Sequence, residues 1–176
     1  MQKKSLRTDD SCREDIERYS DMVYKLAFSL LKNEYDAEDV YQDVFYQYLH
    51  KNPVFQGEEH KKAWFLRVTI NRCRNFFHTA WMLKVMGIQK SGEVEETMPS
   101  PSAEEEALKK EPDELIELVK TLPQKYRVVI HLFYYEDLSI EEISSILKKK
   151  PSTVRTQLTR ARALLKEVLK EDFYVS

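Results

Sequence analysis

Glycine and cysteine are scarce in this sequence, and their scarcity excludes several classes of protein. Only three of the 176 residues are glycine, so the Gly-rich turns that join the strands of sheet proteins are missing. No alternation of apolar and polar residues extends beyond a few positions, so the period of half-buried strands is missing too. The two cysteines, Cys12 and Cys73, match neither a zinc-ligand spacing nor a disulfide framework. The sequence therefore predicts an all-α protein.

Long apolar runs are absent as well. Hydrophobic residues make up 42% of the chain, which is enough for a core, but no run approaches the roughly 18 apolar residues that a bilayer-spanning helix needs. The first ten residues are polar and lack the apolar centre of a signal peptide. We therefore expect a cytoplasmic protein with no direct insertion into a membrane.

Charges of one sign are missing from long stretches, although the net charge is only −2. Residues 33–43 hold five acids and no Lys or Arg, whereas residues 60–90 hold seven Lys or Arg and no acid. Residues 91–117 hold ten acids and two lysines, and residues 148–166 hold seven Lys or Arg and no acid. Two basic segments with an acidic connector predict two contacts with one polyanion. The first acidic segment predicts a contact with a different, basic partner.

Apolar periodicity predicts three helices in the first half of the chain, at about residues 16–31, 37–50 and 61–81. Asp36 is the expected N-cap of the second helix, where the macrodipole favours acids. The side chains expected to face inward from that helix are Val40, Val44, Phe45, Tyr48 and Leu49.

The third predicted helix has two different faces. Its apolar face carries Leu66, Ile70, Cys73 and Phe77, and its polar face carries Arg67, Asn71, Arg74 and His78. The aromatic residues Trp64, Phe65 and Phe76 alternate with the cations. Rings among cations suit stacking on unpaired bases, although aromatic residues on a helix more often belong to a core. Both interpretations remain open from the pattern.

The second half of the chain begins with a connector. Residues 87–112 are rich in charge, Pro and Ser, a composition typical of a disordered acidic linker. A flexible coil of that length has a root-mean-square span of about 28 Å. We therefore expect two small helical domains, residues 1–86 and residues 113–176, joined by this linker.

Residues 139–166 predict a helix-turn-helix. Ile143, Ile146 and Leu147 share one face of the first helix, and Val154, Leu158, Ala161 and Leu165 share one face of the second. Ser139 with Glu142 fits a capping box, and Pro151 suits the first turn of a helix. The second helix of such a pair enters the DNA major groove.

The face opposite the second apolar stripe suits DNA. It carries Ser152, Arg155, Thr156, Thr159 and Arg160. Short hydroxyls and guanidinium groups suit contacts with phosphates and base edges. A merely solvated basic face in an ordinary helical bundle is the alternative, and the helix pattern alone leaves the two about equal.

Five motifs, in order along the chain, resemble those of the small two-domain sigma factors of bacterial RNA polymerase, the extracytoplasmic-function (ECF) group. Residues 36–45 (DAEDVYQDVF) resemble the family's DAEDLVQETF, and residues 63–71 (AWFLRVTIN) resemble WLYRIARN. Residues 122–127 (LPQKYR), 138–143 (LSIEEI) and 153–162 (TVRTQLTRAR) resemble LPxxyR, lsyeEIA and GTVKSRLxRAR. The match covers most of residues 16–81 and 113–170.

The resemblance implies a protein that binds core RNA polymerase and directs promoter recognition, promoter melting and transcription initiation. The residues implied to dock on the polymerase clamp coiled coil are Asp36, Asp39, Gln42 and Asp43. Those implied to bind the promoter −10 element are Asn52, Lys61, Lys62, Trp64, Arg67, Asn71, Arg72 and Arg74, with a flipped base held in the loop of residues 52–59. Those implied to read the −35 element are Lys150, Ser152, Arg155, Thr156, Thr159 and Arg160. An anti-sigma factor is a further expected partner.

The sequence departs from the family pattern at the turn of the helix-turn-helix. Lys148 and Ser152 stand where the family often has glycine, Lys149 replaces an aliphatic residue, and Gln157 stands where a basic residue is frequent. Additional lysines strengthen phosphate binding without adding sequence information.

No catalytic arrangement is recognisable in the sequence. It contains no Ser/His/Asp pattern, no Gly-rich phosphate loop and no paired carboxylates with a pocket signal, so we expect neither an enzyme nor a cofactor. Two other classes remain as alternatives. A helix-turn-helix regulator that acts without polymerase explains only the C-terminal half. An all-α interaction adaptor, whose basic faces are merely solvated, predicts no strongly salt-dependent DNA binding.

Overall fold

The computed structural model describes residues 9–85 and 119–175, and all regular elements within these ranges are helical. The first unit contains α1 (Asp9–Leu31), α2 (Glu34–Lys51) and α3 (Glu58–Val85). The second contains α6 (Gln124–Ile130), the π-helical turn η1 (His131–Tyr135), α7 (Ile140–Leu147) and α8 (Pro151–Val175). The all-α prediction is confirmed, and the expected linker lies outside the described residues.

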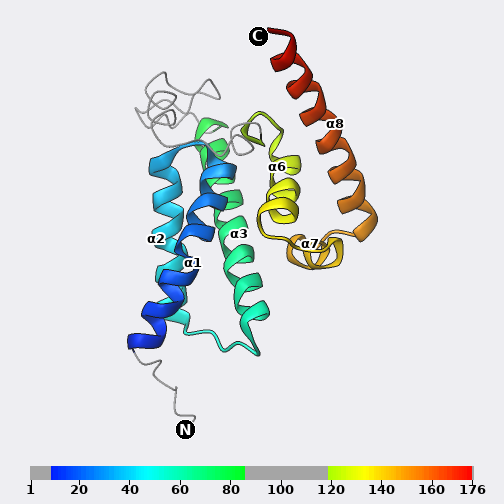
Figure 1. The fold of residues 1–176 in the computed structure, drawn as a ribbon. Helices are drawn as coiled ribbons and strands as arrows, with labels where there is room; N and C mark the ends of the chain where they lie inside the picture. Colours follow the sequence, from blue (N-terminus) through cyan, green and yellow to red (C-terminus); the bar gives the residue numbers. More distant parts are fainter. Residues whose placement is uncertain (1–8, 86–118, 176) are drawn as a thin grey trace.

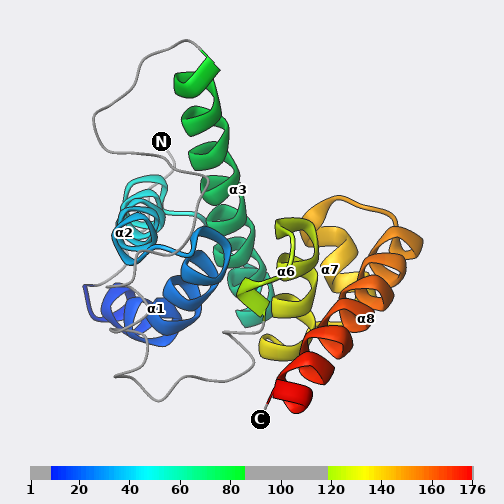
Figure 2. The same ribbon diagram turned by 90° about the horizontal axis from the view of Figure 1, so that it is seen from above.

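The two units lie side by side. The helices α1, α2 and α3 form a bundle, and α6 packs against α1 while α7 packs against α3 (Figures 1 and 2). In both views α8 lies on the outer side of α6 and α7, away from the bundle. None of the helices in the described ranges combines the length and apolar character needed to cross a bilayer.

The start of α2 corrects one prediction. Asn33, not Asp36, is the N-cap, because its extended backbone (φ −141°) lets its side-chain oxygen accept the Asp36 N–H at 3.1 Å. Asn caps helices as well as Asp does, but the prediction named Asp36 alone. Asp36 therefore lies within the first turn, on the same face as later acids.

Packing in the bundle core decides between the two interpretations of Phe65 in α3. Phe65 is fully buried, and its ring centroid lies 4.8 Å from that of Tyr19 and 5.1 Å from that of Tyr48. Phe65 is thus a core residue and not a platform for bases. Leu49 is also misplaced by the sequence pattern, since it is 51% exposed. Neighbouring helical positions point about 100° apart, so the fully buried Tyr48 leaves Leu49 directed outward.

The second unit confirms the predicted helix-turn-helix signals. The Ser139 hydroxyl accepts the Glu142 N–H at 3.1 Å, and the Glu142 carboxylate accepts the Ser139 N–H at 2.8 Å, which completes the capping box. Pro151 is the first residue of α8. Lys148 is the C-cap of α7 and adopts the left-handed conformation (φ 52°), which usually favours glycine. The helix therefore ends in the same backbone conformation that a glycine would adopt at this position.

A buried ion pair joins the start of α1 to the start of α3. Asp15 is 5% exposed, and its carboxylate accepts hydrogen bonds from the Tyr48 hydroxyl and from the Lys61 ammonium, the latter at 2.8 Å. The Lys61 side chain is only 16% exposed. Each charge is costly to bury alone, so the pair holds the three helices in register.

We expect Asp15→Asn to destabilise the protein by about 3 kcal/mol, because it leaves the largely buried Lys61 ammonium with only the exposed Glu58 carboxylate, 3.5 Å away, as its counter-charge. The free energy of unfolding in urea, followed by circular dichroism, measures the loss. Asp21→Asn is the matched control, since Asp21 pairs with Lys25 at the surface at 2.9 Å and should cost about 0.5 kcal/mol or less. Equal effects of the two substitutions would contradict a structural role for the buried pair.

Candidate nucleic-acid and partner interfaces

One face of α2 carries the acidic residues singled out in the sequence. Asp36, Asp39, Gln42 and Asp43 follow one another at helical spacing, and Asp39 and Gln42 are exposed. Partial burial and, to a smaller degree, the neighbouring Asp39 raise the pKa of Asp36. The Asp43 carboxylate pairs with Arg72 of α3 at 3.0 Å. The acidic face is therefore most open to a basic partner at Asp39 and Gln42.

The basic face of α3 divides into two groups. Asn71 and Arg74 are exposed, and Arg67 lies one turn before Asn71 with its Nε atom buried and without a hydrogen-bond partner in the described parts of the chain. These three side chains form one row along the helix.

The cations of the second group form ion pairs with acids of the same chain. Lys61 pairs with Asp15 and Arg72 pairs with Asp43, as described above. Lys62 reaches Glu136 in the second unit, with Nζ 3.3 Å from the carboxylate. Sequence reasoning treated all three cations as equally available, because it had no means of detecting partners distant in the chain.

The loop between α2 and α3 packs against Trp64. Asn52 ends α2 in the left-handed conformation (φ 43°). The Phe55 ring lies edge-on to Trp64, with centroids 5.8 Å apart, and the Gln56 N–H donates to His60 Nδ1 at 3.1 Å. The loop and the first turns of α3 therefore form one continuous surface around a half-buried tryptophan.

The N-terminal half of α8, together with Lys150 just before it, presents the predicted DNA-reading face. The six side chains singled out are all exposed: Lys150, Ser152, Arg155, Thr156, Thr159 and Arg160. The Thr156 and Thr159 hydroxyls donate to backbone carbonyls one turn earlier, at 3.0 and 2.9 Å, so their oxygen atoms remain able to accept. Arg155 lies 3.8 Å from Glu141, a loose surface pair.

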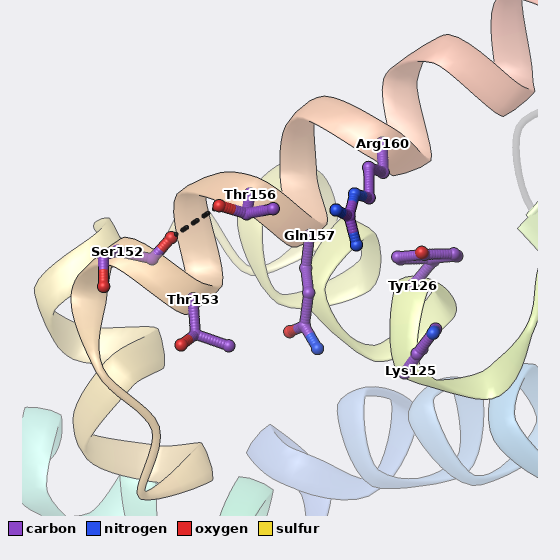
Figure 3. A pocket seen from close by; sticks show the side chains of 7 residues that line it. All are labelled: Lys125, Tyr126, Ser152, Thr153, Thr156, Gln157 and Arg160. Carbon is purple, nitrogen blue, oxygen red and sulfur yellow. Dashed lines mark hydrogen bonds between the residues drawn. The ribbon is translucent and has the colours of Figure 1, made fainter.

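A hollow beside α8 adds residues that the sequence analysis did not select. The cavity measures about 270 Å³ and is lined by Lys125, Tyr126, Ser152, Thr153, Thr156, Gln157 and Arg160 (Figure 3). Lys125 and Tyr126 come from α6, and the Lys125 ammonium lies 4.9 Å from the Tyr126 ring. Lys125 stands within the LPQKYR motif, but only the packing of α6 against α8 brings it beside the recognition face.

Comparisons with known proteins match both units. The sigma-70 region 2 family model matches residues 16–82, and the sigma-70 region 4 family model matches residues 113–165. The RNA polymerase sigma factor SigV of Bacillus subtilis is 33% identical over 150 residues, which cover 85% of this chain and 86% of that protein. The ECF RNA polymerase sigma factor SigW of the same species is 27% identical over 169 residues, covering 92% and 90%. The chain belongs to the ECF sigma factors.

Solved structures agree at the level of the fold. The sigma factor RpoE of Bartonella quintana, in complex with the anti-sigma factor NepR, superposes with a TM-score of 0.66 at 22% identity, covering 90% of this sigma factor and 96% of that chain. CnrH, in complex with the cytosolic domain of CnrY, also gives a TM-score of 0.66, at 21% identity, covering 94% and 91%. As an ECF sigma factor, the protein binds core RNA polymerase and directs transcription initiation at promoters.

Proposed function

We propose that the two halves of this sigma factor divide promoter recognition between them. Residues 1–86 dock on core polymerase and open the −10 element, residues 87–112 connect, and residues 113–176 read the −35 element. The observation that carries this division is the separation of charge: acids on α2, and cations on α3 and on α8. Charge of opposite sign on separate elements suits simultaneous binding of a basic protein surface and DNA.

The proposed polymerase contact is the acidic face of α2. Asp36, Asp39, Gln42 and Asp43 would meet a basic surface on the clamp coiled coil. The exposed Asp39 is the centre of this contact, because Asp36 is partly buried and Asp43 is shared with Arg72. Neighbouring acids also steer a basic partner and raise the association rate.

The proposed −10 contact is formed by α3 and the preceding loop. It comprises Asn52, Lys61, Lys62, Trp64, Arg67, Asn71, Arg72 and Arg74. Arg67, Asn71 and Arg74 would touch the strand directly, whereas Lys61, tied to Asp15, acts chiefly by positioning α3. Opening DNA costs about 1.4 kcal/mol per base-pair step, and each captured or stacked base returns roughly 1–3 kcal/mol. Because a bubble opens more base-pair steps than the few bases that this surface can capture, stable melting needs the polymerase as well as this protein.

The proposed −35 contact is the exposed face of α8. Lys150, Ser152, Arg155, Thr156, Thr159 and Arg160 would lie in the major groove, with Lys125 of α6 beside them. The arginines suit guanine edges, and the lysines suit phosphates.

We further propose that the protein has no catalytic activity of its own, that it acts in the cytoplasm, and that an anti-sigma factor controls it. Chemistry then belongs to the polymerase. The support for a controlling partner is that RpoE and CnrH, which share this fold, are seen in complexes, RpoE with an anti-sigma factor.

Run-off transcription tests the proposed function as a whole. Core polymerase of the host, supplied with genomic fragments, should yield discrete new start sites only when this protein is added. Aligning those start sites gives the −10 and −35 sequences. No new start sites, together with sequence-specific binding of duplex DNA by the protein alone, would support a regulator that acts without polymerase.

Arg155→Ala should weaken transcription from promoters that depend on the −35 element, by about 1–3 kcal/mol if the guanidinium contacts a base. Measuring initiation on templates with single −35 base changes tests this, because a lost base contact removes the preference at one position only. Lys166→Ala, which also removes a cation from an exposed position of α8, is the control. An equal loss on every template would assign Arg155 to phosphate instead.

Asp39→Arg should lower the affinity for core polymerase at least tenfold, since a like charge then faces the basic partner. Titration of labelled protein with core enzyme measures the affinity, and circular dichroism reports whether the fold is retained. Glu38→Arg makes the same charge reversal on the neighbouring exposed position and should bind almost normally. Equal binding by both variants and the wild type would refute the assignment of Asp39.

A further inference from the structure

A neutral residue of α8 and a cation of α6 share the hollow beside the recognition face. Gln157 stands where the family frequently has a basic residue, and it lines this hollow together with Lys125. Figure 3 shows Gln157 and Arg160 directed from α8 toward the side where Lys125 and Tyr126 lie. The cation that α8 lacks at position 157 is therefore supplied to the same hollow by another helix.

The charge of Lys125 has no counter-charge within the described parts of the chain. Lys125 is exposed and borders two hollows, one shared with Arg160 and the other with Arg74 and Lys149, and no acid lines either of them. Burial, and then the charges of Arg74 and Lys125, lower the pKa of Lys149. The ammonium of Lys125 lies 4.9 Å from the ring centroid of Tyr126. A cation surrounded in this way by other cations favours the approach of an anion.

The amide of Gln157 explains why the cation comes from α6. Its Oε1 atom is buried and has no hydrogen-bond partner among the described residues, and a buried acceptor without a donor is costly. An ammonium carries several donors, so Lys125 can donate to Gln157 Oε1 and still bind an anion. A lysine or arginine at position 157 would instead bring a like charge toward Lys125. The amide and the ammonium therefore complement each other.

The rest of the lining suits a phosphate group. The hydroxyls of Ser152 and Thr153 form no hydrogen bonds within the described ranges, so both can donate to an anion. The Arg160 guanidinium adds a planar set of donors that matches phosphate oxygens. Thr156 differs, because its hydroxyl already donates to the Ser152 carbonyl at 3.0 Å. The hollow, about 270 Å³ in volume, thus combines cations and hydroxyl donors from two helices.

We propose that Lys125 and Gln157 form a subsite for a backbone phosphate of the DNA beside the −35 element. The inference rests on the proposed assignment of α8 to that element. In helix-turn-helix proteins the recognition helix contacts base edges while another helix crosses the backbone. A phosphate contact fixes the orientation of the protein and carries no sequence information. Lys125 is thus a positioning residue that sets how α8 lies in the groove, whereas Arg155 and its neighbours read bases.

Lys125→Gln should weaken binding of the holoenzyme to duplex promoter DNA about threefold to tenfold, by the same factor on every −35 sequence. The slope of log K against log salt concentration should become shallower by about 1, because one phosphate contact is lost. Fluorescence anisotropy in the cold, before the duplex melts, measures both quantities. Lys166→Gln makes the same change at an exposed position further along α8 and should leave affinity and slope unchanged.

Promoter duplexes that carry one uncharged methylphosphonate in place of a phosphate locate the subsite. Neutralising the phosphate that Lys125 contacts should weaken the wild-type holoenzyme as much as Lys125→Gln does. The same duplex should cost the Lys125→Gln variant nothing further, because the two changes remove one interaction. At other backbone positions the two proteins should lose affinity equally.

The exchange Lys125→Gln with Gln157→Lys keeps one cation and one amide in the hollow but reverses the helices that carry them. It should restore the affinity and the salt slope, which separates loss of the charge from damage to the packing of α6. An exchange that retains the fold, judged by thermal unfolding, yet does not restore the slope would overturn the pairing of these two residues.

The subsite itself is overturned if Lys125→Gln matches the wild type in affinity, slope and methylphosphonate profile. A loss confined to one −35 base pair would overturn it as well, since Lys125 would then read a base. The assignment of α8 to the −35 element depends on a different measurement, the base preference of Arg155→Ala. Failure of the subsite is therefore distinguishable from failure of that assignment.

Discussion

The rotation of α3 about its own axis determines where the charges of the first unit lie. Burial of Phe65, Leu66, Ile70 and Cys73 fixes that rotation, because all four side chains belong to the apolar core. The remaining positions, including Asn71 and Arg74, must then face outward. The same constraint makes α3 intolerant of large changes in its apolar stripe, although its outer face is free to vary with the DNA that it meets.

The second unit has a small core, yet it must hold one helix rigidly enough to present a fixed face to DNA. The capping box at Ser139 and the left-handed Lys148 fix both ends of α7. Val154, Leu158 and Ala161 then bury one side of α8 and leave the opposite side exposed. Hydroxyls that donate to their own helix, such as Thr156, are held in place before DNA arrives. A preorganised surface of this kind binds with a smaller loss of conformational entropy.

Between these units, the same cations serve two purposes. Lys62 and Arg74 belong to the proposed −10 contact, and both lie at the seam with the second unit. A DNA-binding protein with exposed cations attracts any polyanion.

Local sequence determined the helical class, most helix positions, the capping box, the N-terminal proline of α8 and the exposed face of that helix. Each of these features depends on residues within one or two turns of each other. The resemblance in five motifs determined the family. The structure placed the N-cap of α2 at Asn33 in place of the predicted Asp36, and tertiary packing decided that Phe65 of α3 belongs to the core. It also decided that Lys61, Lys62 and Arg72 find acids at Asp15, Glu136 and Asp43. Those partners come from other segments of the chain, and periodicity within one helix carries no information about a charge that another segment brings into contact.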